Sequence, residues 1–132
     1  MPHEYQIKGG AVVHNRTQLY EFGVGEESAT YTFAEATYTG DIDGPATETF
    51  VAVKHSNGSE SHYGHGIFTG RILGKSGTLN WKFKGKPGQG EIEIVSGTAG
   101  LDGIEGRFLY VLVEGSRTEF TYHGMLEWRS KE

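Results

Sequence analysis

Apolar and polar residues alternate along most of the chain, a pattern typical of β-strands that bury one face. Leu79, Trp81 and Phe83, for example, alternate with polar neighbours, and no segment shows the period of a long helix. This alternation predicts eight strands, at Gln18–Val24, Ala29–Thr39, Thr47–His55, His62–Ile72, Gly77–Lys84, Glu91–Ser96, Arg107–Val113 and Glu119–Trp128.

A short motif recurs between these strands. It has the form threonine, glycine, any residue, an aliphatic residue, any residue and a second glycine, as in Thr39–Gly44, Thr69–Gly74 and, more loosely, Thr98–Gly103. Glycine tolerates positive φ and close approach of neighbouring backbones, so we interpret the motif as hairpin turns and bulges. A phosphate-binding loop would need a helix after the glycines, and none is predicted.

Eight strands without long helices can form either a sandwich or a closed barrel. Sequential hairpins favour the barrel, because closure removes exposed sheet edges. We therefore predict one domain, residues 1–132, folded as an all-β, closed antiparallel eight-stranded β-barrel. The interior of such a barrel holds packed side chains or one small ligand.

Composition removes several classes of function. The chain has no cysteine, which excludes disulfides, thiolate metal sites and a cysteine nucleophile. Its 132 residues carry a formal net charge of -5 without a stripe of Lys or Arg, so nucleic acid is not expected as a partner. The N-terminus lacks the features of a signal peptide, and no apolar run could cross a bilayer. We therefore expect a cytoplasmic protein that does not contact membranes.

One carboxylate shares a strand face with aromatic residues. In the strand Ala29–Thr39, Glu35 lies on the same face as Tyr31 and Phe33. If that face lines the barrel, desolvation would raise the pKa of Glu35 and suit it to proton transfer. At the barrel mouth it would instead be solvated or paired with a cation.

Two histidines occur within one predicted strand. His62 and His65 are three residues apart and point to opposite faces, so they do not predict a shared metal ion. One of them should face inward, either His65 together with Tyr63, or His62 together with Phe68 and the two glycines that flank His65. Inward glycines would leave room for a ligand, and an inward histidine could transfer a proton.

Large aromatic residues recur on the predicted strands and form either the core or the walls of a pocket. The candidate substrate-contacting residues are Tyr31, Phe33, His62, Tyr63, Phe68, Asn80, Trp81, Tyr122 and Trp128.

The strand Arg107–Val113 is apolar on both faces. Phe108 and Tyr110 alternate with Leu109 and Val111, so one apolar face must meet something other than water. A homo-oligomer, either a dimer or a trimer, would cover this face. An N-terminal segment folded over the strand is the alternative.

Several longer stretches resemble a known family of barrels. These are "LYEFGVGEES", "TYTGDIDG", "HYGHGIFTG" and "SGTAGLDGIEGRFLYV", followed by "TEFTYHGMLEW". Together they resemble the allene oxide cyclase barrel superfamily, which has a calycin-like fold, and most of all a small uncharacterised bacterial family within it. The resemblance covers about residues 18–128 and consists largely of turn glycines, which specify fold better than activity.

The resemblance implies ring-closing or isomerising chemistry on hydrophobic substrates, without metal or organic cofactor. In the plant cyclases of this superfamily, a glutamate near the end of the first barrel strand lies beside the substrate's epoxide. Its counterpart here is Glu21 or, with the register moved, Gly23 or the loop residue Glu26.

Two classes of function fit these observations. One is a cofactor-independent isomerase or cyclase for a small hydrophobic substrate, with Glu35, Glu21 and His65 as candidate catalytic residues. The other is a non-catalytic barrel that binds a hydrophobic ligand or has a purely structural role. A carboxylate and a histidine that converge on one cavity would favour the enzyme, whereas a purely apolar cavity would favour binding alone.

Overall fold

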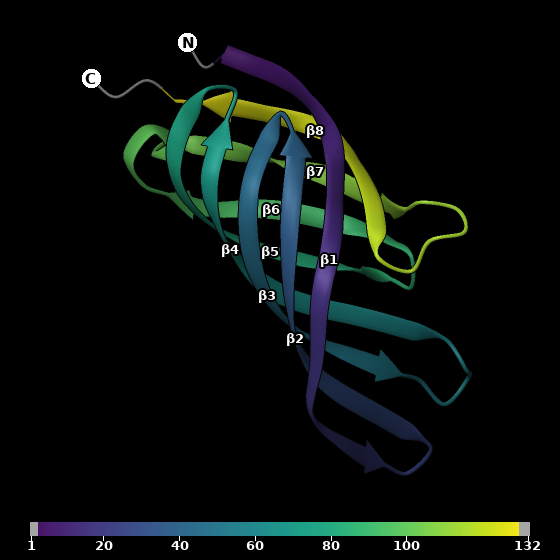
Figure 1. Ribbon diagram of the computed structural model, residues 1–132. Helices are drawn as coiled ribbons and strands as arrows, with labels where there is room; N and C mark the ends of the chain where they lie inside the picture. Colours follow the sequence, from purple (N-terminus) through teal and green to yellow (C-terminus); the bar gives the residue numbers. More distant parts are fainter. Residues whose placement is uncertain (1–2, 130–132) are drawn as a thin grey trace.

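Eight antiparallel strands close into a ring in the computed structural model, which describes residues 3–129 (Figure 1). Each strand pairs with the next in sequence, and the last pairs with the first, which confirms the predicted all-β closed sheet. Among the described residues, no helix is long and apolar enough to span a membrane. The elements are β1 (His3–Val24), β2 (Glu27–Gly40), β3 (Ile42–Lys54), β4 (Glu60–Ile72), β5 (Lys75–Lys86), β6 (Gln89–Gly97), the 3-10 helix η1 (Ala99–Leu101), β7 (Ile104–Leu112) and β8 (Glu119–Trp128).

Strand β1 is much longer than the sequence pattern predicts, because it begins at His3 rather than at Gln18. Two register shifts interrupt its pairing with β2, one between Val13 and Asn15 and one between Gln18 and Tyr20. A bulge of this kind inserts an extra residue and reverses which side chains face inward. The alternation along β1 is therefore broken twice, which hides the strand in the sequence.

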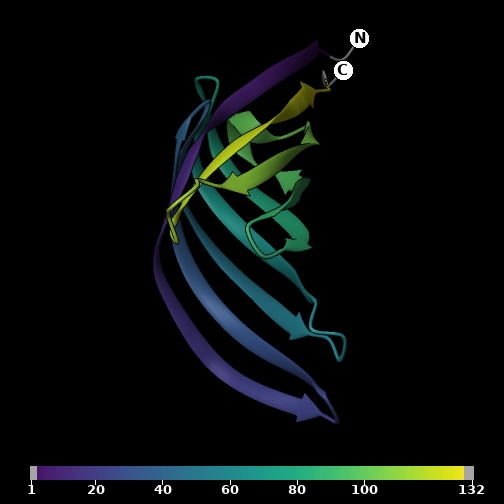
Figure 2. The same cartoon turned by 90° about the vertical axis from the view of Figure 1, so that its right-hand side faces the viewer.

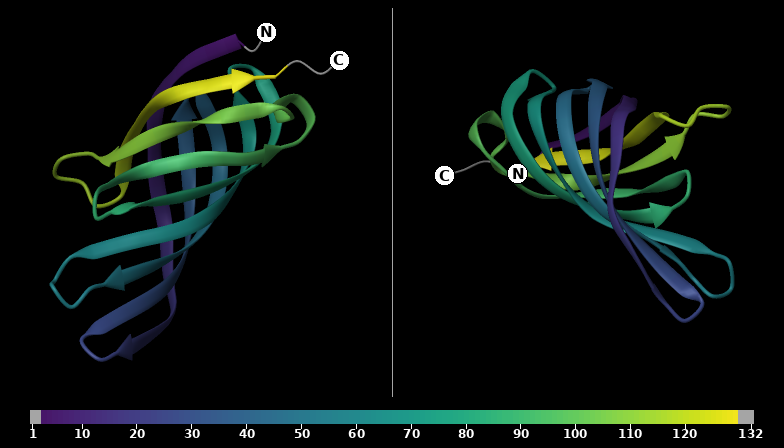
Figure 3. Two further views of the ribbon diagram at one scale, coloured as in Figure 1. Left: turned by 180° about the vertical axis from the view of Figure 1, so that it is seen from behind. Right: turned by 60° about the horizontal axis from the view of Figure 1, so that its bottom comes forward.

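The hairpins of the ring differ in length. The β1–β2 and β3–β4 hairpins project well beyond the turns that join the later strands (Figure 2). The termini lie at the opposite end of the molecule from the β1–β2 turn (Figure 3). The ring therefore has one end near the termini and another end beside the long hairpins.

The end near the termini is filled by the aliphatic residues of the repeated motif. Ile42, Ile72 and Leu101, one from each copy, are completely buried there. Beside them the hydroxyl of Tyr122 accepts a hydrogen bond from the Ile42 N–H at 2.8 Å and donates one to the Thr39 carbonyl at 2.7 Å. The motif thus supplies both the turns at this end of the ring and the apolar side chains that fill it. We call this filled end, near the termini, the closed end.

Trp81 marks the boundary of the packed core. Its indole is fully buried and stacks on Phe68, with ring centroids 5.6 Å apart and planes inclined by 22°. The inward glycines of β4 lie beside this core but do not leave room for a ligand. A Cβ at Gly66 would lie 2.1 Å from Trp81 Nε1, and one at Gly64 would lie 2.6 Å from the ring of Phe83. The expected space beside these glycines is therefore filled by aromatic rings.

Candidate functional site

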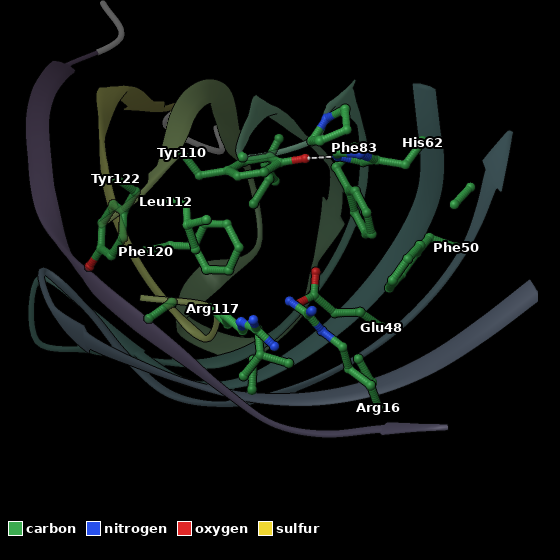
Figure 4. A pocket seen from close by; sticks show the side chains of 18 of the residues that line it. Arg16, Glu48, Phe50, His62, Phe83, Tyr110, Leu112, Arg117, Phe120 and Tyr122 are labelled. Carbon is green, nitrogen blue, oxygen red and sulfur yellow. Dashed lines mark hydrogen bonds between the residues drawn. The ribbon is translucent and has the colours of Figure 1, made fainter. Parts of the chain in front are cut away.

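A cavity of about 330 Å³ lies inside the barrel next to the packed core, and Figure 4 shows side chains that line it. Small residues on β1 and β2, such as Ala34 and Ala36, form one wall. Larger rings, those of Phe50, Phe83 and Phe120, form much of the rest. Short side chains on one wall facing large rings on the other leave the cavity open. The other half of the barrel is filled by packed side chains.

Glu48 on β3 is the carboxylate of this cavity (Figure 4). Its side chain is half-buried, and desolvation raises its pKa from 4.5 to about 7. The Tyr38 hydroxyl, the Trp81 indole N–H and the charge of Arg16 each offset part of that rise. The indole contact falls short of a well-formed hydrogen bond, since Trp81 Nε1 makes none with any described residue. The carboxyl group can therefore hold or release a proton near neutral pH.

A histidine–tyrosine pair lines the same cavity. His62 Nε2 and the Tyr110 hydroxyl form a short hydrogen bond (Figure 4). Burial lowers the pKa of His62, so the ring is neutral at neutral pH. Burial and, to a lesser extent, the charge of Glu48 raise the pKa of Tyr110, so its hydroxyl keeps its proton. A carboxylate and a histidine thus converge on one cavity.

Two arginines lie at the open end of the cavity. Arg16 comes from β1 and Arg117 from the turn between β7 and β8, and both are exposed. Their guanidinium groups extend toward the region of Glu48 (Figure 4).

The carboxylates expected to be catalytic lie elsewhere. Glu35 is exposed on the outer face of β2, because its neighbours Ala34 and Ala36 point into the cavity. Glu21 is exposed, accepts a hydrogen bond of 3.1 Å from the Gln18 side chain and is not part of the cavity wall. Gly23 and Glu26, the alternative positions for the family glutamate, are not part of the wall either.

Of the two candidate histidines, His62 faces inward and His65 outward. The alternative that placed His62 on the side of Phe68 is therefore the observed one. Tyr63 is exposed next to His65 on the outer face. Because the two histidines lie on opposite sides of the wall, they cannot bind one ion. Residues 3–129 contain no group of three or more His, Asp or Glu side chains arranged to hold a metal ion.

The predicted substrate-contacting residues are divided among four environments. His62 and Tyr122 line the cavity, and Phe68 and Trp81 belong to the packed core. Trp128 lies at the closed end, where its indole donates to the Gly100 carbonyl at 3.3 Å. Tyr31, Phe33, Tyr63 and Asn80 lie on the outer surface, because the residues next to them in sequence point inward.

The outer face of β7 is uncovered within the described part of the chain. Leu109 and Val111 are each 45% exposed. The N-terminal residues from His3 onward pair with β8 as part of the ring rather than folding over β7, so that alternative is wrong.

Glu48 and Tyr110 were not among the residues predicted from sequence. A signal for Glu48 was present, because it lies between Ala46 and Phe50 on a face that also carries Ala52. A carboxylate in an otherwise apolar alternation indicates an inward-facing charge. Tyr110 gave no comparable signal, because both faces of its strand are apolar.

Comparisons with known proteins agree with this geometry at the level of the fold. A crystal structure of a DUF3224 family protein of unknown function from Shewanella oneidensis MR-1 superposes with a TM-score of 0.83. It is 17% identical in sequence, and the match covers 97% of this chain and 100% of the other. Comparison with curated proteins gave no match. The family model described as "Protein of unknown function (DUF3224)" matches residues 11–124, so this chain belongs to the DUF3224 family.

Proposed function

We propose that the protein is a cofactor-independent isomerase or cyclase that binds a small, mainly apolar molecule in the cavity and moves a proton through Glu48. The observation that carries this proposal is the position of Glu48, a carboxyl group with a pKa of about 7 on the wall of a largely apolar cavity of about 330 Å³. A group with such a pKa serves both as base and as acid near neutral pH.

The mechanism needs one proton and no redox partner. In a β,γ-unsaturated carbonyl compound, the Glu48 carboxylate removes a proton from the carbon next to the carbonyl group, and the electron pair moves onto the carbonyl oxygen. Protonated Glu48 then gives the proton to the γ-carbon while the pair on oxygen reforms the carbonyl group, which moves the carbon–carbon double bond into conjugation with it. The apolar wall keeps water away from the reacting atoms.

The pair of His62 and Tyr110 would stabilise the intermediate. With its proton on Nε2, neutral His62 donates to the tyrosine oxygen, which leaves the Tyr110 hydroxyl proton free to point into the cavity. That hydroxyl would then donate a hydrogen bond to the oxygen on which negative charge develops.

The resemblance of the sequence to the allene oxide cyclase barrel superfamily supports the same class of reaction. That superfamily is associated with ring closure and isomerisation without metal or organic cofactor. The apolar walls of the cavity would equally suit a non-catalytic barrel that only sequesters its ligand. The two functions differ in whether Glu48 transfers a proton.

Exchange of the acidic protons of β-tetralone in heavy water, followed by NMR, tests the catalytic proposal. We expect the protein to accelerate exchange, Glu48→Gln to abolish the acceleration, and Glu35→Gln, on the outer face, to retain it. If the protein binds β-tetralone without accelerating exchange, the barrel is a binding protein. If Glu48→Gln retains full acceleration, another group is the base.

A further inference from the structure

The cavity carries an unusual set of charges for this protein. Its ionisable residues include two arginines, Arg16 and Arg117, but only one acidic residue, Glu48. The cavity is therefore positive even when Glu48 is ionised, in a chain whose formal net charge is -5. A local reversal of sign around an apolar cavity favours a negatively charged ligand.

Arg16 faces the cavity because of the bulge in β1. It pairs in register with Ala34, a residue of the cavity wall, after the register shift between Val13 and Asn15. Val13 also faces the cavity, so uninterrupted alternation would point Asn15 inward and Arg16 outward. The extra residue in the strand thus turns this arginine inward.

Arg117 is held by an ordered turn rather than by a free loop. The Ser116 hydroxyl accepts hydrogen bonds from the backbone N–H groups of Thr118 at 3.1 Å and Glu119 at 3.0 Å. The Val13 N–H donates to the Thr118 carbonyl at 2.8 Å, which ties the turn to β1 next to the bulge. The two arginines are therefore placed by segments that are hydrogen-bonded to each other.

Neither arginine forms a salt bridge with a carboxylate among residues 3–129. By contrast, Arg107 lies 3.4 Å from Glu93 on the surface, and Arg129 lies 3.2 Å from Glu105. Glu48 feels the charge of Arg16, but its single carboxyl group does not balance two guanidinium groups directed to the same region, which repel each other. An acidic group would satisfy both, because guanidinium forms strong, directional hydrogen bonds with oxyanions.

We propose that the ligand of this cavity is an organic acid, with its acidic group held between Arg16 and Arg117 and a compact apolar body among Phe50, Phe83 and Phe120. This inference rests on the proposed function, since it names the substrate class of the same cavity. The volume of about 330 Å³ is near the lower limit for small-molecule sites, so the body is no larger than one or two fused rings.

A matched pair of probes tests the inference. β-Naphthoate carries a carboxylate on two fused rings, and β-naphthamide has nearly the same shape without the charge. By calorimetry at neutral pH and low salt, we expect the acid to bind about tenfold more tightly than the amide. Added salt should weaken binding of the acid and leave that of the amide unchanged.

Variants test whether the two arginines cause the preference for the acid over the amide. Arg16→Gln and Arg117→Gln should each reduce the affinity for the acid about fivefold or more and leave the affinity for the amide unchanged. Arg107→Gln, on the outer surface, is the matched control and should change neither affinity. All three positions are exposed, and thermal melting verifies that the variants fold.

The outcomes separate this inference from the proposed function. If the protein binds the acid and the amide equally well, or if both Arg16→Gln and Arg117→Gln still prefer the acid as wild type does, the proposal of an acidic ligand is wrong. Binding of an apolar molecule in the cavity would still hold in either case. Failure of both probes to bind at millimolar concentration overturns the inference and the cavity binding on which it rests. Exchange of β-tetralone, an uncharged ketone with no acidic group for the arginines to bind, tests the catalytic role of Glu48 in a separate experiment.

Discussion

The indole of Trp81 occupies the space in which Gly66 lacks a side chain. The two residues are cross-strand partners on β5 and β4, and a Cβ at Gly66 would lie 2.1 Å from Trp81 Nε1. This pairing lets a bulky ring lie flat across the barrel interior. It therefore places the buried indole beside Glu48, where the indole N–H offsets part of the rise in the pKa of that carboxyl group.

Gly66→Ala should displace the Trp81 ring and destabilise the protein by about 1–3 kcal/mol, as overpacking of a core does. Urea unfolding followed by tryptophan fluorescence measures the change. Gly23→Ala is the control, because the nearest atom to a Cβ there is 3.5 Å away, an ordinary contact, and its cost should be small. Equal stability of wild type and Gly66→Ala would show that the ring can move freely.

Glu48 should make the stability of the protein depend on pH. Because burial raises its pKa from 4.5 to about 7, the folded state holds the proton more tightly than the unfolded state. Below pH 4.5 both states are protonated, and between 4.5 and 7 only the folded state is. The contribution of Glu48 to the free energy of unfolding therefore falls with rising pH across this window and levels off above it.

Glu48→Gln removes this titration. Relative to wild type, the variant should gain up to about 3 kcal/mol of stability as the pH rises through the window. Urea unfolding of both proteins at a series of pH values gives the difference. Parallel curves would mean that the carboxyl group is well solvated and has no raised pKa.

Tyr110→Phe should leave His62 Nε2 without its partner in a half-buried position. The expected loss of stability is about 1 kcal/mol, the net value of one hydrogen bond. Tyr63→Phe, at an exposed tyrosine on the outer face, should change stability by less than about 0.5 kcal/mol. If both variants were equally stable, water would replace the lost hydroxyl at His62.

The exposed apolar face of β7 predicts self-association. Leu109 and Val111 lie side by side on that outer face, and we propose that a second copy of the chain covers them in a dimer or trimer. Sedimentation at micromolar concentration should show the oligomer, and Leu109→Lys should shift it toward monomer without lowering thermal stability. A wild-type monomer at high micromolar concentration contradicts this proposal.

Much of the fold follows from the sequence, because alternation records which residues share a strand face. The bounds of β8, Glu119–Trp128, agree with the sequence prediction. Leu79, Trp81 and Phe83, predicted to share one face of β5, all lie on the inner side. Local pattern was sufficient for these strands because the one register shift beside Trp81, in the pairing of β5 with β6, places its extra residue on β6 and leaves the alternation of β5 intact.

Alternation defines two faces of a strand, but it does not decide which one lies inside. On β2 the face with Tyr31, Phe33 and Glu35 is the more aromatic, yet it points outward. The inner face carries small residues such as Ala34 and Ala36, because the cavity wall opposite them bears large rings. Which face of a strand points inward depends on the size of the side chains on the opposite wall of the barrel. The sequence of one strand does not contain that information.

The position of the site therefore depended on the closed ring. The residue types were all present in the sequence, but Arg16 faces inward only because the chain gains a residue before it in β1. Glu48 meets His62 and Tyr110 only when β3, β4 and β7 are brought around one cavity. The sequence by itself determined the strands and turns, since these depend on neighbours along the chain. Only the tertiary structure decided which side chains share the interior, because register and packing across the ring select the inward face.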